Sequence, residues 1–130
     1  MNVAQPESCP FCQCVTEHKM VVEYGSMFAI YDRHPVTKGH RLVISKRHVA
    51  DYFAFSYNEK RDAEALLSLL KRQSVEDDPT VQGFNVGMNC GVVAGQTVMH
   101  AHIHLIPRRA GDVEDPRGGV RGCVPGKMGY

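Results

Sequence analysis

The chain has 130 residues, a length typical of one domain that can bury a core without disulfides. Fifteen basic and fourteen acidic side chains leave it almost neutral, so bulk charge indicates neither a specific nucleic-acid partner nor a membrane partner. There is no apolar run of membrane-spanning length, no secretion-signal pattern at the N-terminus, and an odd number of cysteines, five. We therefore expect a cytoplasmic protein whose cysteines are free thiols or metal ligands rather than a secreted disulfide framework.

Three short strands and one long helix are predicted before the middle of the chain. Apolar runs at 20–24 and 27–31, separated by Gly25 and Ser26, predict a hairpin, and alternation at about 40–45 predicts a third strand. Residues 56–78 predict the long helix, because Ser56 and Glu59 have the spacing of a capping box and apolar residues follow at helical intervals. A fourth strand is predicted over 83–91, with Phe84 on one side and Asn89 on the other.

The most informative stretch is "QTVMHAHIHLIPRR", residues 96–109, where His100, His102 and His104 alternate with apolar residues. A period of two predicts a strand that presents all three imidazoles on one face. Successive histidines would lie about 6.6 Å apart and the outer two about 13 Å apart, too far for one zinc ion to bind all three. A solvated strand face would explain one histidine, but three in phase favour a functional site.

These elements predict an α+β domain with an antiparallel sheet and one long helix. The whole chain, 1–130, is predicted as a single domain, with a Cys-x-x-Cys segment at 1–18 and an irregular tail rich in glycine and arginine at 108–130. Four arginines of the tail are either solvated or a basic rim for a polyphosphate chain: Arg108, Arg109, Arg117 and Arg121.

The motif "CPFC" places Cys9 and Cys12 at a spacing that lets two thiolates bind one zinc ion. His48 and His100, at the ends of two predicted strands, are the candidates for the other two ligands. Four protein ligands would make the zinc structural, because a catalytic zinc keeps one position open for water. A thioredoxin-like redox pair is less favoured, because little chain precedes the motif to form the required strand.

The segment "HAHIHLI" resembles the H-φ-H-φ-H-φ-φ signature of the histidine triad (HIT) superfamily. The resemblance extends upstream through "AGQTVMH" and through "DRHPVTKGHRLVISKRH", in which Ser45 stands where the family usually has proline. The "CPFC" motif and the tail "DPRGGVRGCVPGK" resemble the zinc-containing bacterial-type branch described as dinucleoside tetraphosphate hydrolases. The resemblance implies a HIT-like fold, in which a short helix accompanies the antiparallel sheet and the long helix. It also implies a homodimer and a structural zinc ion held by Cys9, Cys12, His48 and His100.

The resemblance also implies a nucleotide hydrolase or transferase that acts at the α-phosphate of a purine nucleotide derivative, such as a dinucleoside polyphosphate or a nucleoside phosphoramidate. His102 corresponds to a nucleophile that forms a covalent nucleotidyl-histidine, a role that a neutral imidazole can fill. By the same match, His104 contacts the phosphate or moves a proton, and His40 supports the triad.

Four further positions match residues that contact substrate in the family. Asp32 corresponds to the acid that binds the ribose hydroxyls, although an aspartate before a proline turn is often only a turn residue. Asn89 corresponds to a phosphate-side residue, and Gln96 and Thr97 to donors for the phosphate and leaving group.

Two other functions remain open from the sequence. One is a zinc-dependent hydrolase in which His100 and His102 hold a catalytic metal beside an activated water. The other is a non-catalytic nucleotide-binding or interaction module, which the intact set of three histidines disfavours.

Overall fold

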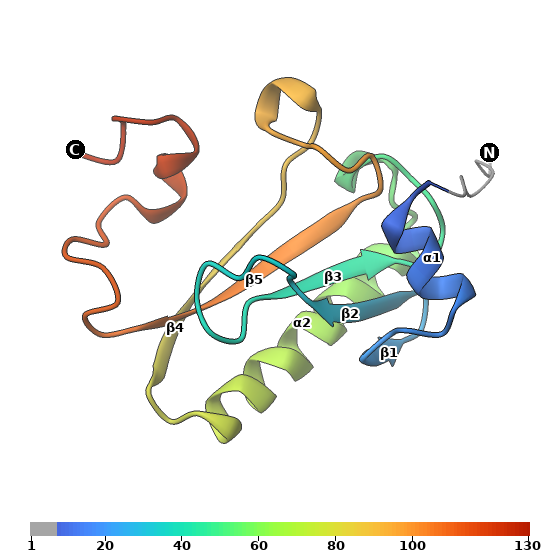
Figure 1. Ribbon diagram of the computed structural model, residues 1–130, viewed down its shortest axis with the longest axis horizontal. Coiled ribbons are helices and arrows are strands. Elements are labelled where there is room, and N and C mark those ends of the chain that lie inside the picture. Colours follow the sequence, from blue (N-terminus) through green and yellow to red (C-terminus); the bar gives the residue numbers. More distant parts are fainter. Residues whose placement is uncertain (1–7) are drawn as a thin grey trace.

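The computed structural model describes residues 8–130, which form a five-stranded antiparallel sheet with a long helix packed against one face (Figure 1). The strands lie in the order β1-β2-β3-β5-β4, so β5, last in the chain, is inserted between β3 and β4. Their bounds are β1 Val22–Tyr24, β2 Met27–Tyr31, β3 Arg41–Ser45, β4 Val81–Gly87 and β5 His102–Arg109. The α-helices of the described chain are α1 Pro10–Thr16 and α2 Tyr57–Asp77, which confirms the predicted α+β architecture.

The predicted hairpin is β1 and β2, and the turn between them depends on Gly25. Its φ of +56° lies in the left-handed region, and a Cβ there would collide with the carboxylate of Asp62. That carboxylate accepts hydrogen bonds from the backbone N–H and the hydroxyl of Ser26, at 2.9 and 2.7 Å. The turn is thereby fixed to α2.

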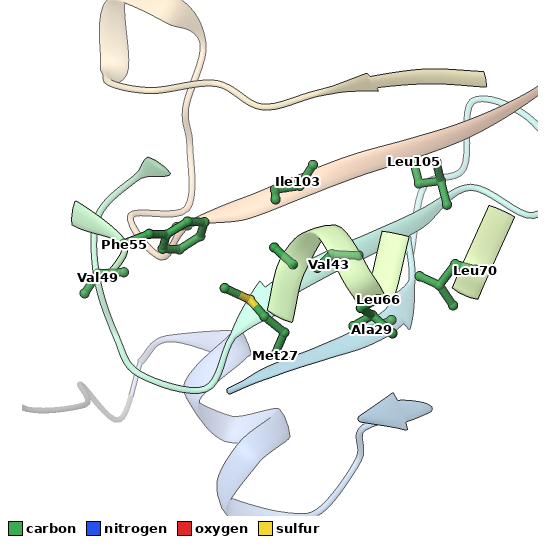
Figure 2. Packing of buried hydrophobic residues seen from close by; sticks show 11 residues of the cluster. Met27, Ala29, Val43, Val49, Phe55, Leu66, Leu70, Ile103 and Leu105 are labelled. Carbon is green, nitrogen blue, oxygen red and sulfur yellow. The ribbon is translucent and has the colours of Figure 1, made fainter. Parts of the chain in front are cut away.

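Helix α2 begins as predicted, because the capping box is complete. The Ser56 hydroxyl accepts from the Glu59 N–H, and the Glu59 carboxylate accepts from the Ser56 N–H. Leu66 and Leu70 of α2 are fully buried against β2, β3 and β5, as Figure 2 shows. Ile103 and Leu105 of β5 belong to this core, so the alternating side chains of β5 face away from α2.

Strand β4 differs from the prediction of a strand over 83–91. It begins at Val81, contains a register shift between Val81 and Gly83, and ends at Gly87, which pairs with His104. Because the ladder stops there, residues 88–100 leave the sheet beside the beginning of β5, and they form the loop at the top of Figure 1. Val86 is 49% exposed, whereas Phe84 packs against the core.

The sheet face opposite α2 is covered at its two ends by different parts of the chain. Helix α1 packs on the apolar residues Phe28, Leu42 and Ile44 at one end. The tail lies beyond β5 at the other end, and Figure 1 shows α1 and the tail on opposite sides of the molecule. The tail is less irregular than predicted, because β5 extends to Arg109 and residues Gly119–Cys123 form a 3₁₀ turn.

Residues 1–7 of the predicted N-terminal segment lie outside the described residues. Within 8–130, no helix combines the length and the apolar character needed to cross a bilayer.

Candidate active site and metal centre

The sheet face opposite α2 carries His102 and His104 of β5, which pair with Ile44 and Leu42 of β3. Both imidazoles are partly buried, and their ring centroids are 5.4 Å apart. His100 precedes β5 rather than lying within it, but its ring is fully buried at the same end of the face. The structure therefore brings the three histidines of the motif to one surface in two different environments.

The backbone determines which nitrogen of the His102 ring carries a hydrogen. Its Nδ1 lies 2.8 Å from the carbonyl oxygen of His100. A carbonyl oxygen can only accept, so Nδ1 carries the hydrogen and donates it. The neutral ring then has its lone pair on Nε2, the nitrogen that a nucleophile needs.

A second group joins His40, His104 and Asp32. The His40 Nδ1 accepts from the backbone N–H of Val36 at 3.2 Å, so the hydrogen of a neutral His40 ring is on Nε2. His40 Nε2 donates to His104 Nδ1 at 2.9 Å, which places the hydrogen of His104 on its own Nε2. A carboxylate oxygen of Asp32 lies 3.4 Å from His40 Nε2 and 3.9 Å from His104 Nδ1.

Burial favours the neutral form of both of these rings. It lowers the pKa of His40 below the ordinary value of 6.5, against the opposing effect of the Asp32 charge. Burial also lowers the pKa of His104, and the neighbouring His102 and His40 act in the same direction. These directions agree with the hydrogen-bond pattern, which needs a lone pair on one nitrogen of each ring.

The other predicted cluster is formed by Cys9, Cys12, His48 and His100, whose donor atoms lie within 4.8 Å of one another. Cys9 Sγ is 3.4 Å from His100 Nδ1, and Cys12 Sγ is 3.2 Å from His48 Nδ1. The two Nδ1 atoms are 3.1 Å apart. A tetrahedral zinc ion with ordinary bond lengths would hold sulfur and nitrogen about 3.6 Å apart and two nitrogens about 3.4 Å apart, so these spacings are compatible with zinc.

The hydrogen bonds around the cluster favour the same interpretation. His100 Nε2 donates to the carbonyl oxygen of Ser45 at 2.7 Å, which leaves the lone pair of a neutral ring on Nδ1, facing the thiols. Burial lowers the pKa of His100 to about 4. Burial and the nearby Cys9 raise the pKa of Cys12 to about 12. A metal ion would supply the positive charge that stabilises the thiolates.

Helix α1 contributes a residue that the sequence analysis did not single out. Cys9 is the N-cap of α1, and Pro10 occupies its first turn. Phe11, buried between the cysteines, contacts His102 edge-on with ring centroids 5.1 Å apart, and it lies 5.8 Å from the His100 ring. The only sequence signal for this contact was the apolar residue inside "CPFC", because 91 residues separate Phe11 from His102.

Gln96 shapes the loop that follows β4. Its side chain is buried, its amide donates to the carbonyl oxygens of Ala50 and Val98, and its Oε1 accepts from the Gly91 N–H. Both amide hydrogens are therefore used within the protein. Thr97 is exposed next to it, and Asn89 is half-buried where the chain leaves β4.

The four arginines suggested as a basic rim are each engaged with other groups. Arg108 binds both carboxylate oxygens of Asp112 at 2.8 Å, and Arg109 binds Asp78 at 2.9 Å. Arg117 pairs with Asp115 at 3.4 Å. Arg121 donates to the Lys127 carbonyl and stacks on Tyr130. The structure does not gather these side chains into one rim.

Comparison with known proteins gives the same assignment across most of the chain. The HIT domain family matches residues 13–111. The adenosine 5'-monophosphoramidase hnt1 of Schizosaccharomyces pombe is 36% identical over 104 residues, which cover 78% of this chain and 74% of that protein.

Two solved structures share the fold at similar identity. A zinc-bound histidine triad family protein from Mycobacterium smegmatis has a TM-score of 0.75 and 33% identity, covering 83% of this chain and 80% of its own. A HIT family protein from Bacillus anthracis has a TM-score of 0.74 and 34% identity, covering 83% of this chain and 78% of its own. With the family match, the histidine face and the fold in agreement, this chain belongs to the histidine triad family.

Proposed function

We propose that this protein is a nucleotide hydrolase or transferase that cleaves at the α-phosphate through a covalent intermediate on His102. The observation that carries the proposal is the hydrogen bond from His102 Nδ1 to the His100 carbonyl at 2.8 Å. It fixes Nδ1 as the nitrogen that carries the hydrogen, so the neutral form of the ring has its lone pair on Nε2 before any substrate is bound. Family membership supports the same reaction class.

In the first step, His102 Nε2 attacks the α-phosphorus, and the bond from phosphorus to the leaving group breaks. The electron pair departs with the leaving group, which takes up a proton from solvent. His104 Nε2–H, oriented by His40, donates to the charge that develops on the phosphate. The nucleotidyl-His102 ring carries a positive charge that its Nδ1–H shares with the His100 carbonyl.

In the second step, water attacks the phosphorus, and the electron pair of the phosphorus–nitrogen bond returns to Nε2. The water releases one proton, which balances the proton taken up by the leaving group. Two displacements thus replace one difficult step, and the neutral tautomer of His102 is regenerated.

The residues proposed to bind substrate lie around the rings of His102 and His104. Asp32, whose other carboxylate oxygen accepts from the His34 N–H, offers acceptors suited to ribose hydroxyls. We infer from the family resemblance that Asn89 and Thr97 contact the phosphate and the leaving group. Gln96 has a positioning role, because its amide holds the loop that carries Thr97.

An adenosine 5'-phosphoramidate is the first substrate to test, and diadenosine tetraphosphate the second. The monophosphoramidase name of the fission-yeast relative supports a purine nucleotide with a phosphorus–nitrogen bond. Dinucleoside polyphosphates present the same α-phosphate, but they need a site for the remaining phosphates.

The metal cluster is proposed as a structural zinc site. Zinc would neutralise the Cys9 and Cys12 thiolates and hold α1 against the sheet, where Phe11 contacts His102. His48 completes the donor set together with His100, and His102 donates to a carbonyl instead. This arrangement supports a structural metal over a zinc-dependent hydrolase that uses His100 and His102.

The covalent intermediate is tested by trapping. Wild-type protein quenched during turnover of adenosine 5'-phosphoramidate labelled at phosphorus should carry acid-labile label on the peptide that contains His102. His102→Asn should retain nucleotide affinity within a few-fold, lose turnover by about three orders of magnitude or more, and carry no label.

His34→Asn is the matched control, since His34 is exposed and lies outside both clusters. It should keep wild-type turnover and labelling. Near-native turnover by His102→Asn, or turnover by the wild type without a trapped label, would reject His102 as the nucleophile.

A further inference from the structure

The turn at residues 35–39, which precedes His40, lies beside the last part of β5. The pairing between β3 and β5 ends where Arg41 meets Leu105, whereas β5 continues to Arg109. The turn therefore contacts a part of β5 that β3 does not reach, and these contacts are not those of a regular ladder.

Two hydrogen bonds join this turn to β5. The Thr37 hydroxyl donates to the carbonyl oxygen of Pro107 at 2.7 Å. An Nη2 hydrogen of Arg109 is donated to the carbonyl oxygen of Lys38 at 3.0 Å. Gly39 has a φ of +91°, and a Cβ there would be 3.4 Å from the Pro107 ring. The turn is thus fixed closely against β5 at successive positions.

Arg109 is itself held by the end of α2. Its Nε and Nη2 donate to the same carboxylate oxygen of Asp78 at 3.2 and 2.9 Å, and Asp78 is the C-cap residue of α2. Hydrogen bonds from Thr80 and Arg109 lower the pKa of Asp78 to about 2, so the carboxylate is ionised at neutral pH. Arg109 therefore connects the end of α2 to the turn that precedes His40.

The same turn decides which nitrogen of the His40 ring carries the hydrogen. The Val36 N–H donates to His40 Nδ1, and the backbone N–H of His40 donates to the Thr37 carbonyl, both at 3.2 Å. If the Val36 N–H pointed elsewhere, Nδ1 could carry the hydrogen, and His40 Nε2 would no longer donate to His104. His104 would then carry its hydrogen on Nδ1 and would lose the Nε2–H that is proposed to act on the phosphate.

We infer that Arg109 is a positioning residue for His40 and His104, and that it acts with Thr37 through the turn at 35–39. Its side-chain hydrogen bonds go to Asp78 and Lys38 rather than to either ring. It holds the turn in the shape that directs the Val36 N–H at His40. The effect on catalysis rests on the proposed function, because it requires His104 to donate to the phosphate.

The first measurement is of the tautomer, and it requires no substrate. Two-bond proton–nitrogen correlation NMR spectra at about pH 8, where the rings are neutral, distinguish the ring nitrogen that carries a hydrogen from the one that does not. Wild-type His40 should carry its hydrogen on Nε2. In Arg109→Met, which keeps an unbranched side chain without donors, a measurable fraction should carry it on Nδ1. The double variant with Thr37→Val should show a larger fraction.

The second measurement is kinetic. With adenosine 5'-phosphoramidate, Arg109→Met should lower kcat by about tenfold and leave KM within about twofold, because a donor is misoriented while no substrate contact is lost. Arg109→Lys keeps N–H donors at this position without the planar guanidinium, so it should recover part of the loss.

Arg117→Met is the matched control. Arg117 also pairs with an aspartate, Asp115, at 3.4 Å, but it lies on the tail with 74% of its side chain exposed. Its replacement should leave kcat, KM and the His40 tautomer unchanged. Thermal melting shows whether each variant is folded. If Arg109→Met does not fold, Asp78→Asn removes only the charge that holds Arg109, and it should change the tautomer and kcat in the same direction.

The outcomes separate this inference from the proposed function. If the wild type cleaves no nucleotide, the proposed function is wrong, and the response of the His40 tautomer alone decides whether Arg109 positions the ring. If the wild type is active, a folded Arg109→Met protein with either the wild-type tautomer or the wild-type kcat rejects the inference. A higher KM with unchanged kcat also rejects it, because the turn would then act in substrate binding.

Discussion

In each of the rings of His40, His102 and His104, a hydrogen bond decides which nitrogen carries the hydrogen. The Val36 N–H orients His40, His40 orients His104, and the His100 carbonyl orients His102. Alternation in the sequence predicted that the triad histidines share a face. It could not predict these tautomers, because they depend on a backbone amide and a carbonyl whose directions arise only in the fold.

The pH dependence follows from the buried rings. Because the pKa of His40 and of His104 is lowered in the fold, the stability that their neutral forms contribute is present above pH 6.5 and is lost as pH falls through the lowered values.

We expect kcat/KM to be constant from neutral pH down to about 6.5 and to fall below it, as protonation breaks the hydrogen bond between His40 and His104. A pH profile checks this expectation, with NMR titration of the His40 ring to assign it. An acid limb with an apparent pKa at or above 6.5 would contradict it.

At the scale of elements, α1 and its N-cap reach both clusters of the site. The N-cap, Cys9, belongs to the group of side chains that could hold a metal, and the second residue of α1, Phe11, contacts His102. The Cys-x-x-Cys spacing predicted two zinc donors, and the predicted strand ends and the family resemblance supplied His48 and His100. The structure brings the four side chains together. The contact from α1 to β5 was not predictable, because it depends on how a short helix is oriented by ligands that lie far along the chain.

Replacing Cys9 by serine separates metal binding from helix capping. Serine is a good N-cap, so Cys9→Ser should preserve the start of α1 while removing a metal donor. We expect native protein to contain about one zinc per chain, and the variant to lose most of it and to melt several degrees lower. Elemental analysis and thermal melting measure both effects.

Cys14→Ser is the control for this experiment. Cys14 is on the same helix but outside the donor cluster, and its replacement should change neither zinc content nor melting temperature beyond a small packing effect. A Cys9→Ser protein with unchanged metal and unchanged melting temperature would reject the zinc site.

At the scale of the whole molecule, the sequence predicted the strands and the long helix but not the order of the strands. Insertion of β5 between β3 and β4 is a long-range pairing, and no local pattern specifies it. The end of β4 at Gly87 is equally non-local, because it depends on where the ladder with β5 stops. That early end matters for function, since it frees the loop that carries Gln96 and Thr97.

A homodimer remains a prediction of the family resemblance. The leucines of α2 do not add to it, because Leu67 and Leu69 pack against the core of this chain. The position of β4 as an edge strand of the sheet is compatible with pairing between two copies. Sedimentation at micromolar concentration should give twice the chain mass, and a monomer throughout that range would reject the prediction.

Alternate residues of strand β5 face opposite sides of the sheet. Ile103 and Leu105 pack on the α2 side, and His102 and His104 lie on the other side. A single inserted or deleted residue within β5 would exchange the two sides, burying imidazoles under α2 and exposing the aliphatic groups. Folding and chemistry would then be lost in the same event. Related sequences should therefore tolerate substitutions at the apolar positions of this strand but no change in its length, and a library of one-residue insertions, screened for soluble expression, should be depleted throughout 102–105.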